Sequence, residues 1–251
     1  MAFERYCLDG LARIFGSKKW TFIRNAIDSS TDEELSDAVA TRDDAAVLVE
    51  CKGTFITSAD KYSGEPGRFM KGLTRKFGRG KHGGVRQLVR AISHAWFQRV
   101  AVKSIPNSPK IADVYPVLVI QDPVVGSGPV AKVLSDRFQK AIGDARRHVS
   151  HKTPRIWPLT VLTADDMDRL VAGSNIPGGH TAVAIFKRFH RTHPSRIISF
   201  GDFLTSQGSE LWPAAERKSV VNERFKAATK GTLERFEQGE YGNAVADQAQ
   251  P

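Results

Sequence analysis

One stretch of the chain constrains its fold more than any other: the apolar run Tyr115-Pro116-Val117-Leu118-Val119-Ile120. A half-exposed strand alternates apolar and polar residues, whereas this run is apolar throughout, so we expect a strand that is buried on both faces. Strands of this kind occur in sheets with helices packed on both sides. Residues 156–162 predict another buried strand. The sequence therefore predicts an α/β protein.

Hydrophobic spacing predicts the other elements. The second and third of three early strands form a hairpin around a four-residue polar turn, 41–44. A long, glycine-rich basic loop follows at 54–84, with one turn of helix within 67–77. We expect strands at 20–23, 35–40 and 45–52, and helices at 2–15, 85–102, 126–148, 164–172, 179–193, 199–207 and 214–237. This order predicts a central mixed β-sheet flanked by helices.

A chain of 251 residues can bury one large core. Residues 1–125 are expected to hold the first helix, the hairpin, the basic loop, the next helix and the first buried strand. Residues 126–237 are expected to be the remaining α/β part of the same domain, and mostly helical. Residues 238–251 form a polar tail that we expect to be disordered.

Charge is the feature of the composition that bears most on function. Lys and Arg number 37 against 27 Asp and Glu, which gives a net charge of +10. Excess positive charge attracts polyanions, so nucleic acid is the favoured partner and a merely basic surface is the alternative. With no long apolar run and no signal segment, we expect no membrane span and a cytoplasmic location. Two cysteines, Cys7 and Cys51, exclude a disulfide framework and a four-cysteine zinc site.

Ionisable side chains gather where the third strand ends. Glu50 and Lys52 are two residues apart, so on a strand they project from one face with Cα atoms about 6.6 Å apart. Asp37 lies on the preceding strand, which a hairpin brings to about 4.8 Å, and it can stand near Glu50 if the register allows. Asp43 and Asp44 are alternatives for this acid, but their place in the turn marks them as turn formers first.

Two carboxylates that are held close together repel each other, and at least one is pushed toward protonation. A divalent cation removes the conflict, and oxygen ligands suit Mg²⁺ or Mn²⁺, which also bind phosphate. Such a metal can activate water for attack on a phosphodiester, while Lys52 offsets negative charge. The opposing interpretation is that Asp37, Glu50 and Lys52 simply face solvent on a half-exposed hairpin.

Asp37 followed by Glu50-Cys51-Lys52, behind a helix and in αβββαβ order, resembles the PD-(D/E)xK nuclease superfamily, which includes restriction endonucleases and Holliday-junction resolvases. The resemblance covers about residues 1–125. It implies a restriction-endonuclease-like core with a C-terminal helical elaboration. It further implies that Asp37 and Glu50 bind Mg²⁺ and that Lys52 is the catalytic lysine. One departure is Ser36, where the family pattern has proline.

The same resemblance suggests two further site residues. Many members carry an additional metal-binding acid on the first helix, for which Glu4 is the best match and Asp9 the second. Some branches carry a glutamine on the helix after the core strands, and Gln87 matches it as a catalytic residue.

Residues 71–86 hold six Lys or Arg side chains and no acidic one. Directly after the catalytic strand, they are predicted to contact a phosphate backbone, although a solvated loop is the alternative. The predicted nucleic-acid contacts are Lys71, Arg75, Lys76, Arg79, Lys81 and Arg86.

The sequence thus predicts a Mg²⁺-dependent endonuclease that hydrolyses DNA, with defence or mobile-element processing as the role that family habit suggests. A catalytically inactive nucleic-acid-binding module on the same fold is one alternative, and an interaction subunit of a larger complex is another. A homodimer is a further possibility, since family members that cut both strands often pair.

Overall fold

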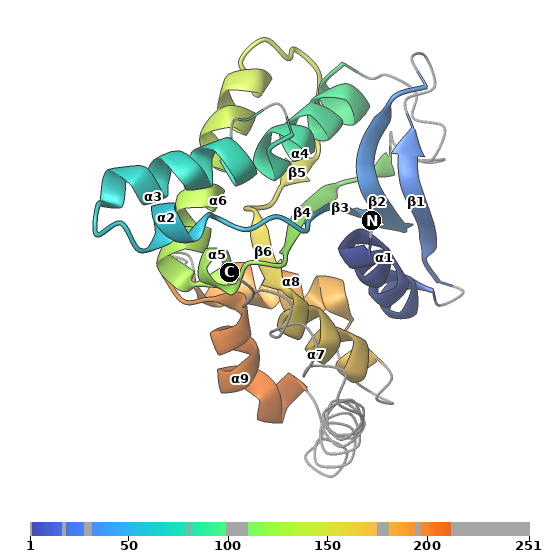
Figure 1. Ribbon diagram of the computed structural model, residues 1–251. Helices are drawn as coiled ribbons and strands as arrows, with labels where there is room; N and C mark the ends of the chain where they lie inside the picture. The colour runs from blue at the N-terminus through green and yellow to red at the C-terminus, as the bar shows by residue number, and fades with distance from the viewer. Residues whose placement is uncertain are drawn as a thin grey trace.

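The computed structural model of the protein describes residues 2–16, 19–27, 32–78, 80, 82–98, 110–174, 181–193 and 197–211. In this part of the chain a mixed six-stranded sheet lies between two layers of helices (Figure 1). The predicted α/β class with a central mixed sheet is therefore confirmed. The strands run in the order β1 (Thr21–Ile27), β2 (Glu34–Arg42), β3 (Ala45–Lys52), β4 (Asp113–Ile120) and β5 (Arg155–Ile156), and β6 (Thr160–Thr163) also pairs with β4.

The first three strands are antiparallel, and β3 begins the parallel part of the sheet with β4. The turn between β2 and β3 is tighter than the four residues predicted, because Thr41 and Arg42 still pair with Ala46 and Ala45. Only two residues remain for the turn. One of them, Asp43, has φ +50°, a left-handed conformation that Asp tolerates better than most residues.

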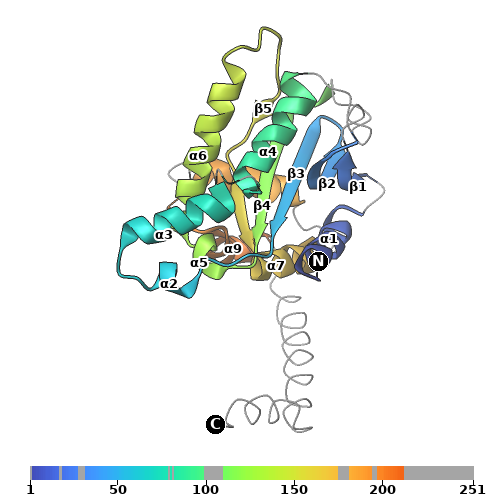
Figure 2. The same ribbon diagram turned by 45° about the horizontal axis from the view of Figure 1, so that its top comes forward.

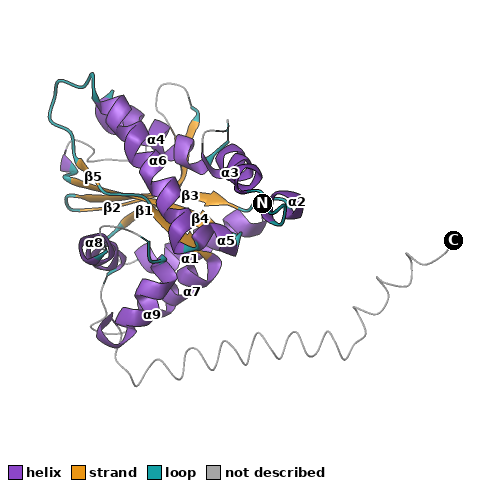
Figure 3. Cartoon of the chain, turned by 90° about the vertical axis from the view of Figure 1, so that its left-hand side faces the viewer, coloured by secondary structure: helices purple, strands orange, loops and turns teal. Residues whose placement is uncertain are grey.

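Alternation along β3 divides the core into two layers. Ala46 and Leu48 point to one cluster, which helices α4 (Gly84–Ile92) and α6 (Gly128–Arg146) cover, while Val47 and Val49 point to the other. Figure 3 shows α4 and α6 on one side of the sheet and α7, α8 and α9 on the other. The second layer consists of α1 (Ala2–Phe15), α7 (Ala164–Ser174), α8 (Ala182–Thr192) and α9 (Phe200–Leu211).

Strand β4 lies in the middle of the sheet and is buried on both faces, as its apolar sequence predicts. Val117, Leu118, Val119 and Ile120 are each at most 1% exposed. Burial of side chains of this size contributes about 1.5–3 kcal/mol apiece to folding. Strand β3 pairs with β4 along its whole length, so the end of β3 is fixed by hydrogen bonds to the buried central strand.

The prediction of a loop at 54–84 was wrong, because most of this segment is helical. It contains α2 (Ser58–Lys61), α3 (Pro66–Leu73) and a π-helical turn, η1 (Thr74–Gly78). Leu73 and Phe77 are fully buried in the core under α4 and α6. Tertiary packing of these two side chains outweighs the low helix propensity of the local glycines.

Two other boundaries differ from the prediction. The strand expected at 156–162 is divided into β5 and β6, since Pro158 between them has no N–H to donate to a ladder. The helix expected at 85–102 is α4, which continues into a π-helical turn, η2 (Ser93–Phe97). The short helix α5 (Pro123–Gly126) precedes α6. The helix expected at 214–237 and the tail at 238–251 lie outside the described residues. Within the described part, no helix has the length and apolar character needed to span a membrane.

Candidate active site

The register of the β2–β3 hairpin places Asp37 beside Glu50. Val39 pairs with Leu48, and continuing this register by two residues puts Asp37 opposite Glu50 on the same face of the sheet. Asp37 is also fixed at the strand end, because its Oδ2 accepts a hydrogen bond of 2.6 Å from the backbone N–H of Cys51. The two acids therefore face the layer that contains α4.

Glu50 is nearly inaccessible to solvent, with 1% of its surface exposed. Its Oε1 accepts a hydrogen bond of 2.6 Å from Lys52 Nζ, which makes a largely buried ion pair. Its Oε2 is buried and has no hydrogen-bond partner among the described residues. An unpaired carboxylate oxygen in this position is costly unless a ligand or solvent satisfies it.

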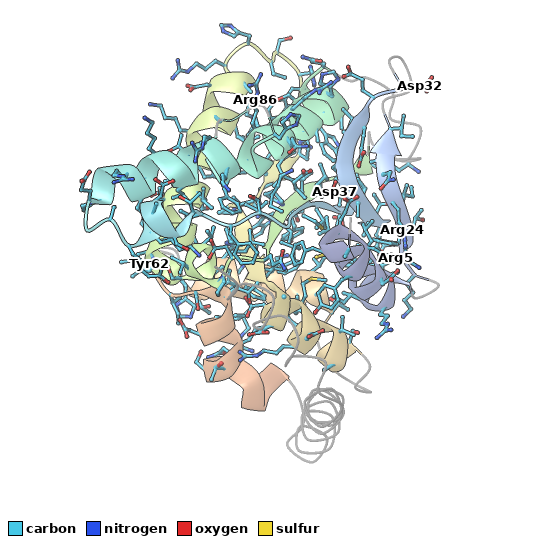
Figure 4. The ribbon with its side chains drawn as sticks, viewed as in Figure 1. Arg5, Arg24, Asp32, Asp37, Tyr62 and Arg86 are labelled. Atoms are coloured by element: carbon cyan, nitrogen blue, oxygen red, sulfur yellow. The ribbon has the colours of Figure 1, made fainter. Side chains whose placement is uncertain are left out.

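A cavity of about 540 Å³ opens beside these groups. Its wall comes from the start of α1, the start of β2, the end of β3 and the first turn of α4. Figure 2 shows the start of α1 close to the end of β3, and Figure 4 shows Asp37 near the middle of the molecule. All the predicted catalytic and metal-binding residues contribute to this wall, namely Glu4, Asp37, Glu50, Lys52 and Gln87.

Helix α4 approaches the site closely because it begins with glycine. A β-carbon at Gly84 would lie 3.5 Å from Glu50 Cγ and 3.4 Å from Lys52 Cγ. It would also lie only 2.4 Å from Leu118 Cδ1, a distance that real side chains do not adopt. One turn further along, Gln87 reaches the cavity, and its Oε1 is buried without a hydrogen-bond partner among the described residues.

The alternative acids that the sequence offered lie elsewhere. Asp9 is ion-paired with Arg24 at 2.9 Å on the outer side of α1 and does not line the cavity. Asp43 and Asp44 are exposed in the turn at the opposite end of the hairpin from Glu50. The structure therefore selects Asp37 as the acid that accompanies Glu50.

The acid that sequence reasoning missed is Glu34, the first residue of β2. Its carboxyl group lines the cavity, and the charge of Asp37 acts on it there. Strand alternation places residues 34 and 37 on opposite faces. A shift of register between β1 and β2 at Glu34 and Ile27 marks the irregularity that lets both line one cavity. The sequence gives no signal for this irregularity, so it could not have identified Glu34 as a site residue.

Excess negative charge is the main electrostatic feature of the site. Of the described residues that line the cavity, four carry carboxyl groups and one, Lys52, carries an ammonium group. Burial, followed by the charge of Asp37, raises the pKa of Glu50 to about 8. Burial also raises the pKa of Asp37, against the lowering effect of the Cys51 N–H bond. Burial and the neighbouring Asp37 raise the pKa of Glu34. A further positive charge in the site would favour the ionised form of each of these acids.

The donor set fits a hard divalent cation. Carboxylate oxygens are the ligands that Mg²⁺ takes, and Mg²⁺ typically binds one or two carboxylates while it keeps several waters. The described residues contain no ready-made group of three His, Cys, Asp or Glu side chains around one point. Mg²⁺ needs fewer protein ligands than three. Glu50, whose Oε2 is unpaired, and the neighbouring Asp37 match the one or two carboxylates that it takes.

Comparison with known proteins adds little to this geometry. No protein-family model and no curated protein matches the chain. Among solved structures, it is similar to the small subunit of the heterodimeric restriction endonuclease R.BspD6I, with a TM-score of 0.38 and 13% sequence identity over 84% of this chain and 89% of that chain. A TM-score this low does not establish a shared fold.

The four predicted nucleic-acid contacts that the structure describes lie on helices or a helical turn instead of a loop. Lys71 on α3 and Arg86 on α4 are exposed and make no ion pair within the described residues. Arg75 lies 3.6 Å from Asp60. Lys76 Nζ donates to the carbonyl oxygen of Phe55, so Lys76 holds the segment that follows β3. Arg79 and Lys81 lie outside the described residues.

Proposed function

We propose that the protein is a metal-dependent nuclease of the PD-(D/E)xK type with a restriction-endonuclease-like core, and that it hydrolyses phosphodiester bonds of DNA. One observation carries the proposal: Asp37 and Glu50 face each other across two strands, with Lys52 bonded to Glu50, in the wall of an open cavity. A half-exposed hairpin does not explain why Glu50 is buried with one unpaired oxygen, whereas a cation-binding site explains both.

Each side chain has a role that follows from its position. Glu50 Oε2 and Asp37 would hold Mg²⁺ or Mn²⁺, and Glu4 would add a further oxygen from α1. When bound, the ion would supply a water molecule of lowered pKa and positive charge for the phosphoryl oxygens. Lys52 Nζ is held at the cavity wall by Glu50, where it can donate to an attacking water or to a phosphate oxygen.

Gln87 supports the same chemistry through hydrogen bonding. Its amide faces the cavity from α4, and a side-chain amide can both accept from water and donate to a phosphate oxygen. Such a group orients a nucleophile without changing its charge, which is the contribution of positioning to catalysis.

Charge and the family resemblance support DNA as the substrate. The net charge of +10 attracts a polyanion, and the exposed cations Lys71 and Arg86 lie on the helices α3 and α4, on the face of the sheet to which Asp37 and Glu50 point. The choice of DNA over RNA comes from the resemblance alone, because phosphate contacts are common to both.

Incubation of supercoiled plasmid with Mg²⁺, Mn²⁺, Ca²⁺ or a chelator tests the proposal. We expect cleavage in Mg²⁺ or Mn²⁺, none in chelator, and none by Glu50→Gln or Lys52→Ala. Lys132→Ala is the matched control, since Lys132 pairs with Asp136 at i,i+4 on the surface of α6. Wild-type cleavage by the Lys52→Ala protein would overturn the mechanism, provided that circular dichroism shows both variants folded.

A catalytically inactive nucleic-acid-binding protein on the same fold is a second candidate. The observation that favours it is the 2.6 Å contact between Lys52 Nζ and Glu50 Oε1, which occupies one of the two oxygens that a metal would use. This candidate predicts DNA binding with no metal-stimulated cutting. The same plasmid experiment, together with a gel-shift assay, separates the two.

A further inference from the structure

A second pocket, of about 330 Å³, adjoins the catalytic cavity. Glu34, Leu35 and Gln87 line both spaces, so these residues form the boundary between them. The remaining described residues of the second pocket are basic: His82, Arg86 and Arg90.

The two spaces differ in the ionisable side chains that line them. The first is dominated by carboxyl groups, whereas the second carries three basic side chains against the single acid Glu34. His82 and Arg86 are exposed and have no ion-pair partner within the described residues, so both remain available to a ligand. Arg90 is ion-paired with Glu33 beside the start of β2.

Helix α4 connects the two spaces. Its first residue, Gly84, abuts Glu50 and Lys52, and Gln87 follows one turn later at the boundary. Arg86 and Arg90 are four residues apart, so they lie on one side of the helix with a separation of about 6 Å along its axis. The second pocket thus begins about one turn of α4 beyond Gly84, the residue that abuts Glu50 in the catalytic cavity.

We propose that this second pocket binds a phosphate group of the substrate strand next to the phosphate in the catalytic cavity, with Arg86 as the principal contact and His82 as a second donor. The proposal rests on the proposed function. Arg presents a planar fork of donors that matches phosphate oxygens, and its charge is permanent. A strand with consecutive phosphates would satisfy both spaces at once: one phosphate would lie in the cavity lined by the acids, and its neighbour would meet Arg86. The pocket would then fix how the strand lies across the site.

The experiment is a phosphate-by-phosphate scan of DNA binding in Ca²⁺. Short oligonucleotides carry one uncharged methylphosphonate at successive positions, and Kd is measured by fluorescence anisotropy for wild type, Arg86→Ala and Arg13→Ala. Arg13 is exposed in the last turn of α1 and is the matched arginine control. For wild type we expect one position at which neutralisation weakens binding about tenfold, the scale of one charge-assisted contact.

For Arg86→Ala we expect the same loss with unmodified DNA and no further loss at that one position, whereas Arg13→Ala keeps the wild-type profile. Coupling of this kind in a double-mutant cycle identifies a direct contact. Additive losses at every position would overturn the proposal, and so would an unchanged Kd for the folded Arg86→Ala protein. Arg86→Lys keeps the charge but loses the fork, so its partial recovery of affinity would support the assignment.

Two arms of the scan separate the possible sources of the phosphate. Strands that end in a terminal phosphate at the sensitive position are compared with strands that continue beyond it. Tight binding only to the strands that end there would show that the pocket takes a terminal phosphate. Equal binding of both kinds of strand would show that it takes an internal phosphodiester. Coupling without any metal-dependent cleavage would refute the nuclease and leave the pocket standing, while cleavage without coupling would refute the pocket alone.

Discussion

Replacement of Glu50 by glutamine tests the electrostatics of the site directly in the metal-free protein. Glu50 is buried, and its pKa is raised from 4.5 to about 8 by burial and by Asp37. The folded protein therefore holds this proton more tightly than the unfolded chain does. The stabilisation is complete below the unfolded pKa and is lost as pH rises through the folded pKa. Stability must then fall between about pH 4.5 and pH 8.

The size of the effect follows from the two pKa values. Between pH 6 and pH 9 the loss for Glu50 alone is about 2.5 kcal/mol. In a chain of 251 residues this corresponds to a fall in Tm of about 5–10 °C. Asp37 and Glu34 have raised pKa values as well, so the contribution of each to stability also falls as pH rises. Glutamine stays neutral, so the Glu50→Gln protein should lose most of this dependence and be the more stable protein at pH 9.

Mg²⁺ should oppose the loss of stability with rising pH, because a cation favours the ionised form of Glu50. At about 100 times its Kd, a ligand that binds only the folded state stabilises by about 2.7 kcal/mol. We expect this stabilisation in wild type to be larger at pH 9 than at pH 6, and to be absent in Glu50→Gln. Asp43→Asn, in the exposed turn, is the control and should behave as wild type.

Urea denaturation followed by tryptophan fluorescence provides the assay, with chelator or Mg²⁺ at each pH from 6 to 9. Parallel pH profiles for wild type and Glu50→Gln in chelator would show that Glu50 is ionised in the folded protein, and would refute the electrostatic description of the site. Equal stabilisation of both proteins by Mg²⁺ would place the cation elsewhere.

Four further substitutions test the site and the structure around it. Lys52→Ala should lower plasmid cleavage at least about 100-fold, the scale of one lost electrostatic donor, and a smaller loss would deny Lys52 a catalytic role. Gly84→Val should abolish cleavage and cost about 1–3 kcal/mol in urea denaturation, because a β-carbon would meet Leu118 at 2.4 Å. Gly143 lies on α6, and a β-carbon there would meet no atom within 4 Å. Gly143→Ala should therefore be neutral or stabilise the protein by about 0.5–1 kcal/mol. Asp122→Ala should cost about 3–5 kcal/mol, because Asp122 is fully buried and bonded to a lysine ammonium and a backbone N–H; a cost below about 1 kcal/mol would contradict this.

The parts of the fold that were predictable are those with a strong period in the sequence. Helix α1 has the predicted limits, 2–15, because its apolar residues keep helical spacing to the last turn. The relation between Asp37 and Glu50 follows from the hairpin, since alternation leaves few registers that keep Val39 and Leu48 in one core.

The parts that were not predictable depend on distant contacts. Helix α3 and turn η1 exist because Leu73 and Phe77 find a core made by α4 and α6, which a local window does not contain. Glu34 enters the cavity only through an irregular strand register. The second pocket likewise requires knowledge of how α4 lies against the start of β2.

The cavity beside Glu50 takes its walls from α1, β2, β3 and α4, so the candidate site residues extend from Glu4 to Gln87. No shorter fragment contains all of them, and no element presents more than a part of the constellation by itself. A chain that is still being synthesised, or one that has lost its tertiary packing, therefore carries none of the assembled site.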